Sequence, residues 1–100
     1  MAKGYWIARV DVKNPDDYKK YAAAIQPIFK KYGARYLTRG GRSENVEGQN
    51  RSRNVVIEFP DYEAALGCYR SPEYAEAKKL RASASDGDII VLEGYDGPQP

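Results

Sequence analysis

Histidine is absent from this 100-residue chain, and cysteine occurs only once, as Cys68. Histidine is the commonest general base near neutral pH and the commonest transition-metal ligand. One cysteine cannot form an intrachain disulfide, and without histidine it cannot complete a structural zinc site. The composition therefore excludes Ser-His and Cys-His catalytic pairs and histidine-ligated haem. We expect neither a metal nor a cofactor.

Strong net charge and long apolar runs are also lacking. Lysine and arginine number 16 against 14 acidic residues, a net charge of +2, so we expect neither nucleic acid nor a membrane surface as a partner. The apolar runs are far shorter than the roughly 20 residues that span a bilayer, and the first residues hold no apolar segment of signal-peptide length. Together with the unpaired cysteine, these features predict a cytoplasmic protein.

The sequence pattern predicts one α+β domain over residues 1–96, followed by a loose tail at 97–100. Asn14 and Pro15 indicate a helix start and Gly33 its end, while Ser71 and Pro72 restart a helix after a short one. Pro27 should kink or split the first helix. We expect strands at 4–12, 34–41, 54–59 and 88–95, and helices at 15–32, 62–69 and 72–84. This order is the ferredoxin-like βαββαβ fold, a four-stranded antiparallel sheet with its first and third strands central and its helices on one face.

Alternation along each predicted strand separates two faces of the sheet. One face is apolar throughout and is assigned to the helices: Trp6, Ala8, Val10 and Val12, then Val55, Ile57 and Phe59, then Ile90 and Leu92. The other face holds Tyr5, Ile7, Arg9 and Asp11, then Val56 and Glu58, then Ile89, Val91 and Glu93, with Leu37 and Arg39 expected to join it. This second face is too apolar for a sheet face in water, which predicts a homodimer joined through it.

Four charged side chains on the second face leave two interpretations open: Arg9, Arg39, Glu58 and Glu93. They can form an ion-pair network that fixes how the two copies dock. Alternatively, they surround a cavity in which the arginines hold an anionic ligand. In that case Glu58 is the first candidate for a catalytic base, because no histidine is available.

Several short stretches along the chain together resemble a known family. They are Arg39-Gly40-Gly41, Glu47-Gly48, the strand end Val56 to Pro60, Tyr69 with the segment Ser71 to Tyr74, Arg81, and Glu93-Gly94. On these residues the chain resembles a bacterial domain-of-unknown-function family, number thirteen-thirty, within the dimeric α+β barrel superfamily. The resemblance implies a ferredoxin-like fold and a dimer joined through the sheets, and it implies no established activity.

The same stretches add candidates outside the sheet face. Tyr69 and Arg81 are candidate ligand-binding residues. The competing interpretation is core packing for Tyr69 and a solvated or salt-bridged helix residue for Arg81, with a structural clamp left open beside the site role of Arg81. Gly40 and Gly41 predict a β-bulge. Cys68 is expected to be a buried, inert thiol rather than a nucleophile.

Two classes of function stay open. The protein binds or transforms a small metabolite, aromatic or carboxylate-bearing, in a sheet-face cavity, or it is a non-catalytic dimeric binding or structural module. Related α+β barrels include cofactor-free oxygenases, isomerases and decarboxylases, but a shared fold is weak support for a shared function. RNA binding is rejected because residues 54–58 offer no aromatic platform for stacked bases.

Overall fold

The computed structural model describes residues 2–100. The elements follow the order β1 (Gly4–Val12), α1 (Pro15–Lys31), β2 (Arg35–Arg39), β3 (Arg53–Phe59), α2 (Tyr62–Arg70), α3 (Pro72–Lys79) and β4 (Ser85–Glu93). This is the predicted βαββαβ order, with the second helical segment divided in two. No helix within the described residues is both long enough and apolar enough to cross a membrane.

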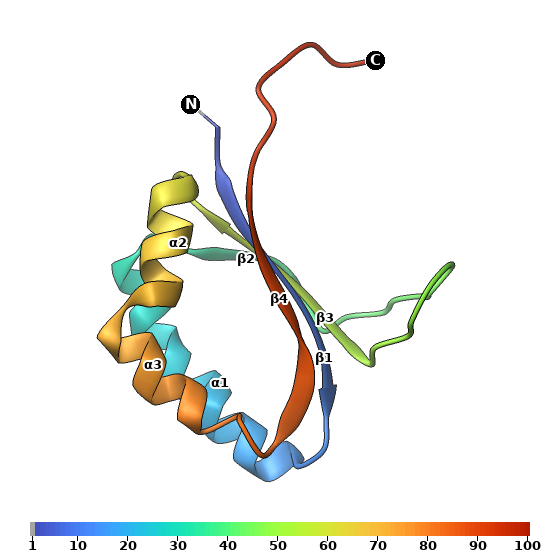
Figure 1. Cartoon of the computed structure of the whole chain (residues 1–100), viewed down its shortest axis with the longest axis vertical. Coiled ribbons are helices and arrows are strands. Elements are labelled where there is room, and N and C mark those ends of the chain that lie inside the picture. Colours follow the sequence, from blue (N-terminus) through green and yellow to red (C-terminus); the bar gives the residue numbers. More distant parts are fainter. Residues whose placement is uncertain (1) are drawn as a thin grey trace.

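The four strands form one antiparallel sheet in the order β2-β3-β1-β4. β1 and β3 are therefore central, as predicted. All three helices cover the same side of this sheet (Figure 1). We call the other side the open face; its residues include Tyr5, Ile7, Arg9, Val56, Glu58, Ile90 and Leu92.

Local capping explains where the helices begin and end. The side chain of Asn14 accepts a hydrogen bond from the backbone N–H of Asp17 at 3.1 Å, which starts α1. Gly33, with a φ of 73°, reverses the chain after α1. The helix continues across Pro27, so the predicted split is not found, and Pro27 lies on the exposed side of the helix. Ser71 Oγ accepts from the N–H of Tyr74 at 3.1 Å and caps α3, which confirms the predicted helix restart.

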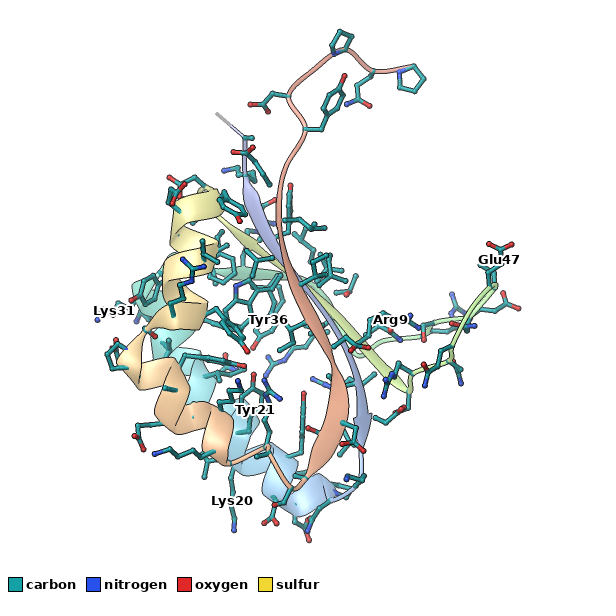
Figure 2. The ribbon with its side chains drawn as sticks, in the orientation of Figure 1. Arg9, Lys20, Tyr21, Lys31, Tyr36 and Glu47 are labelled. Atoms are coloured by element: carbon teal, nitrogen blue, oxygen red, sulfur yellow. The ribbon has the colours of Figure 1, made fainter. Side chains whose placement is uncertain are left out.

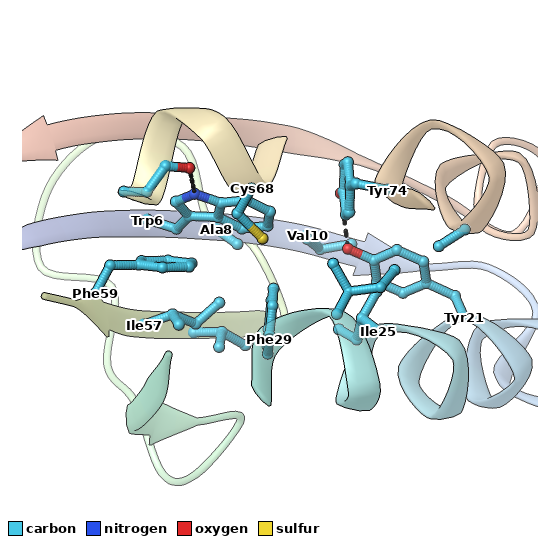
Figure 3. Packing of buried hydrophobic residues seen from close by; sticks show 14 residues of the cluster. Trp6, Ala8, Val10, Tyr21, Ile25, Phe29, Ile57, Phe59, Cys68 and Tyr74 are labelled. Atoms are coloured by element: carbon cyan, nitrogen blue, oxygen red, sulfur yellow. Dashed lines mark hydrogen bonds between the residues drawn. The ribbon is translucent and has the colours of Figure 1, made fainter. Parts of the chain in front are cut away.

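The core lies between the helices and the sheet, with Trp6 at its centre (Figure 3). Trp6 is 1% exposed and its indole N–H donates to the carbonyl of Ala65 at 2.8 Å. Its ring lies 5.1 Å from Tyr74, 5.2 Å from Phe29 and 5.4 Å from Phe59, measured between ring centroids. This aromatic cluster ties β1, α1, β3 and α3 together.

The predicted phase of β4 is wrong. β4 begins at Ser85, so Asp86 and Gly87 are strand residues rather than a turn. Val91 pairs with Trp6, which directs Val91 and Ile89 toward the helices and leaves Ile90 and Leu92 on the open face, 52% and 41% exposed. Residues 89–92 are all apolar, so the sequence pattern does not show which of their side chains face the helices. The pairing register between β4 and β1 determines this.

Glu93 and Arg39 are also on the wrong face in the sequence prediction. Glu93 pairs with Gly4 and therefore lies on the helix side of the sheet. A bulge between Tyr36 and Thr38 shifts the phase of β2, so that Arg39 pairs with Val55 on the helix side. The bulge predicted at Gly40 and Gly41 therefore lies earlier in the chain than expected. Gly40 instead follows the strand with a φ of 67°.

Candidate functional site

A narrow cleft of about 30 Å³ opens between α1 and the helix side of the sheet. Apolar and aromatic side chains form its walls, and two guanidinium groups, of Arg39 and Arg53, border it. No carboxylate or thiol contributes to this lining. The cleft therefore combines an apolar interior with positive charge at its border. This combination suits an anionic ligand whose body is apolar.

Arg53 is placed by its position on β3. It pairs with Val10, so its side chain points to the helix side, where its Cζ lies 5.6 Å from the ring centroid of Tyr18. Its Nε is buried and has no hydrogen-bond partner among residues 2–100. A side chain at position 40 would run into Nη1 of Arg53, so the absence of one at Gly40 makes room for the guanidinium.

Arg39 lies beside Arg53 at the edge of the sheet. Its Cζ is 4.3 Å from the ring centroid of Tyr36, a close cation–π contact. Gln26 on α1 holds that ring in turn, because its Nε2 donates to the Tyr36 hydroxyl at 3.0 Å. Neither Arg39 nor Arg53 has a carboxylate within 4.0 Å in the described chain.

A polar triad of Tyr21, Tyr74 and Arg81 adjoins the cleft through Tyr21, which lines it. The hydroxyls of Tyr21 and Tyr74 lie 2.8 Å apart, and Arg81 donates to the Tyr74 hydroxyl from Nη2 at 3.3 Å. Burial, with Tyr74 alongside, raises the pKa of Tyr21 well above its ordinary value. Tyr21 lines the cleft as a neutral phenol. Arg81 is therefore tied to the buried Tyr74, as a structural clamp would be, while its part in ligand binding stays a prediction.

Tyr69 and Cys68 take part in packing. The Tyr69 ring lies 5.6 Å from Trp6 and 5.1 Å from Tyr74, as its packing interpretation required. Cys68 is fully buried, and burial, with Glu73 nearby, raises the pKa of its thiol to about 12. An inert thiol was expected.

The charges predicted to gather on the sheet face do not meet. Arg9 lies on the open face, but it donates to the side chains of Asn54 and Asn45 at 3.0 and 3.2 Å and to the carbonyl of Gln49 at 3.0 Å. Glu58 is half-buried on the open face, opposite Tyr5 and Arg35, and makes no ion pair within the described chain. With Arg39 and Glu93 on the helix side, neither an ion-pair network nor a cavity joins the four.

Three residues of the cleft were not predicted from the sequence as site residues: Arg53, Tyr18 and Tyr36. Arg53 was assigned to the loop, although it continues the alternation of Val55 and Ile57 along β3 and would have been found by starting that strand one residue earlier. No group of three or more cysteine or acidic side chains within residues 2–100 is placed to hold a metal ion.

Solved structures share the fold. The RPA0582 protein of unknown function from Rhodopseudomonas palustris is 20% identical over 96% of this chain and 85% of its own, with a TM-score of 0.75. SnoaB, a cofactor-independent oxygenase from Streptomyces nogalater, is 11% identical over 100% and 97%, with a TM-score of 0.62. A dimeric ferredoxin-like protein of unknown function from Thermobifida fusca is 14% identical over 92% and 89%, with a TM-score of 0.58.

These likenesses establish the ferredoxin-like fold, and no curated protein sequence matches the chain. A family match goes further. The family described as Domain of unknown function (DUF1330) matches residues 3–95, which is almost the whole chain. The resemblance found in the sequence motifs is confirmed, and the chain belongs to the DUF1330 family.

Proposed function

We propose that this protein is a homodimer that binds a small carboxylate-bearing aromatic molecule in the cleft between α1 and the sheet. The buried Nε of Arg53, which lacks a hydrogen-bond partner in the described chain, carries the ligand proposal. Leaving such a donor unpaired costs about 1–3 kcal/mol. A ligand carboxylate would satisfy it through a charge-assisted hydrogen bond, in the forked geometry that suits a guanidinium.

The rest of the cleft fits the aromatic part of such a ligand. The rings of Tyr18, Phe29 and Tyr36 line it, and Arg39 supplies a second positive charge. Its volume of about 30 Å³ holds one or two water molecules, whereas ligand pockets measure roughly 300 Å³ or more. Binding therefore requires the exposed Arg39 and the half-buried Tyr18 to move outward.

Binding without chemistry fits this cleft better than catalysis does. Its lining offers guanidiniums and phenols, and the raised pKa of Tyr21 makes that phenol a hydrogen-bond donor rather than a base. Glu58, the catalytic candidate from the sequence, lies on the opposite face of the sheet and cannot touch a ligand in the cleft. The cytoplasmic location expected from the sequence stays a prediction.

Fluorescence titration tests the ligand proposal, because Trp6, the single tryptophan, lines the cleft. We expect 2-naphthoate to change Trp6 emission and the neutral 2-naphthamide to have little effect. Arg53→Met should weaken 2-naphthoate binding at least about tenfold, since a charge-assisted hydrogen bond is worth about 1.5–3 kcal/mol. Arg70→Met removes an exposed arginine of α2 and should leave binding unchanged.

A stability measurement on the same variants separates anchoring from folding. Because Arg53→Met removes an unpaired buried donor and keeps an apolar side chain, it should unfold at an equal or higher urea concentration than the wild type. Equal binding of 2-naphthoate by Arg53→Met and the wild type would refute the proposed anchor. Failure of all aromatic carboxylates to bind the wild type would refute the proposed function.

The homodimer proposal rests on the open face. Ile90, Leu92 and Leu37 are 52%, 41% and 45% exposed there, beside the half-buried Ile7 and Val56. Apolar groups gathered in this way mark an interaction surface. The nearby guanidinium of Arg9 already has hydrogen-bond partners within its own chain through Nε and Nη2, which lowers the cost of covering it. A dimeric protein among the structures of the same fold supports the same arrangement.

Sedimentation velocity tests the homodimer. Ile90→Asp places a charge within the proposed interface on both copies and should give monomers at concentrations where the wild type is dimeric. Leu80→Asp is the matched control, because Leu80 is 41% exposed but follows α3 on the helix side. A wild type that stays monomeric at every concentration would refute the dimer.

A further inference from the structure

Residues 40–52, which join β2 to β3, form an arm. It extends from the sheet on the side away from the helices (Figure 1). A second copy bound to the open face must lie on this same side, so the arm is in position to meet it. The inference below rests on the proposed homodimer.

The base of the arm is held in place. Arg9 points toward it and binds Asn45 and Gln49, while Glu47 lies at the far end (Figure 2). Asp11 accepts hydrogen bonds from the backbone N–H of Ser52 at 2.9 Å and from Arg51 at 3.0 Å. A held arm loses little conformational freedom when it binds, which favours affinity.

The tip of the arm is apolar with acidic flanks. Val46 is 83% exposed, the highest exposure among the large hydrophobic side chains described, and Glu44 and Glu47 stand close to it in sequence. Nothing in its own chain covers Val46. An aliphatic side chain exposed in this way on a held loop is a candidate contact for another molecule.

A hollow with complementary chemistry lies on the open face beside β2. We call it the trough; its volume is about 440 Å³, and Leu37 and Val56 contribute apolar walls. Arg42 adds positive charge to its lining. An apolar tip with acidic flanks therefore matches an apolar hollow with a basic border, in both surface type and charge sign.

We infer that the arm of each subunit docks in the trough of a second copy of this chain, with Val46 against Leu37 and Val56 and with Glu47 near Arg42. A two-fold axis makes such a contact twice in each dimer, because each copy offers both an arm and a trough. This assigns Arg9 a role different from ligand binding: it positions the arm.

Dimer affinity of arm variants tests the apolar part of the contact. Val46→Asp should raise the dimer Kd about tenfold or more, because the loss occurs at two symmetric places. Leu80→Asp, the matched control on the helix side, should leave the Kd unchanged. Circular dichroism should show both variants folded, since both side chains are exposed.

Charge reversal tests the pairing itself. Glu47→Arg alone and Arg42→Glu alone should each weaken the homodimer several-fold at low salt, because each places like charges together twice. An equimolar mixture of the two variants should restore wild-type affinity as a heterodimer, in which both arm-trough contacts again join opposite charges. The loss should shrink at high salt, where exposed charges are screened.

The outcomes separate this inference from the dimer on which it rests. If Ile90→Asp gives monomers while Val46→Asp dimerises like the wild type, the dimer stands and the arm contact is refuted. If each charge variant is weakened but the mixture is not restored, the assignment of Glu47 to Arg42 is refuted. A monomeric wild type refutes both proposals.

Discussion

The hydroxyl oxygens of Tyr21 and Tyr74 lie 2.8 Å apart in the core, on side chains that are 5% and 0% exposed. Arg81 donates to the Tyr74 hydroxyl from Nε and Nη2, at 3.4 and 3.3 Å. The Tyr74 hydroxyl therefore has two hydrogen-bonded partners, whereas Tyr21 bonds Tyr74 and lies with its ring centroid 5.5 Å from the Cζ of Arg81. The arrangement joins α1 to α3 and holds Tyr21, which lines the cleft.

The two tyrosines should differ in what their hydroxyls contribute to stability. Tyr74→Phe should lower the free energy of unfolding by about 2–3 kcal/mol, because it leaves both a buried phenol and a guanidinium without their partner. Tyr21→Phe should cost about 1 kcal/mol, because Tyr74 still accepts from Arg81. Urea denaturation followed by Trp6 fluorescence measures both.

A double-mutant cycle completes that comparison. The double variant Tyr21→Phe with Tyr74→Phe should lose less free energy of unfolding than the sum of the two single variants. The reason is that the second change removes a hydroxyl that the first change left unpaired. Additive costs, or equal costs for the two single variants, would contradict the assignment of Tyr74 as the shared partner.

Cys68 should not react with thiol reagents in the folded protein. It is fully buried, and burial raises the pKa of its thiol to about 12, so almost no thiolate exists near neutral pH. An aromatic disulfide reagent should label it only after denaturation, with Cys68→Ser as the blank. Fast labelling of the native protein at pH 8 would show that the thiol is accessible.

The same raised pKa affects stability at alkaline pH. The unfolded chain ionises this thiol near its ordinary pKa of 9.0, whereas the folded chain keeps it neutral up to about 12. The contribution of the neutral thiol is therefore fully present below pH 9 and is lost as the pH rises from 9 toward 12. Cys68→Ala should show a smaller loss of stability over that pH range than the wild type.

The ionised carboxylate of Asp11 should hold the arm at pH values above its pKa and release the arm at pH values below it. The backbone N–H of Ser52, together with Arg51, lowers the pKa of this carboxyl below its ordinary value of 3.8. Because the folded pKa is depressed, the stabilising effect is present above pH 3.8 and is lost as the pH falls through the lower value. Asp11→Asn should speed amide hydrogen exchange at Ser52 at neutral pH.

Asp16→Asn is the control for that measurement. Asp16 is exposed in the first turn of α1, away from the arm. The Asp16→Asn variant should show the same rate of amide hydrogen exchange at Ser52 as the wild type. Unchanged exchange in Asp11→Asn would show that other contacts hold the arm.

Gly87 should tolerate no side chain. A Cβ at this position would run into the carbonyl of Arg9 and the backbone of Val10, neither of which can move without disturbing β1. Gly87→Ala should therefore lower the free energy of unfolding by about 1–3 kcal/mol. Gly41→Ala is the control: its Cβ would have nothing within 4 Å, so stability should stay the same or rise slightly.

Element order and capping were predictable because they depend on neighbours in the sequence. Asn14 and Ser71 cap their helices through residues three positions away, a spacing that the sequence displays directly. Trp6 alternates with Ala8 and Val10, so its place in the core follows from the strand period alone. The family motifs led to the same fold.

The candidate site was not predictable in the same way, because its residues are brought together by register. One bulge after Tyr36 moves Arg39 to the helix side. In β4, four consecutive apolar residues do not reveal which side chains face the helices. Arg9 is occupied by a loop some forty residues away in the chain, so its charge was not free for a ligand. Local pattern shows which side chains alternate, but long-range pairing between strands selects the face on which each one lies.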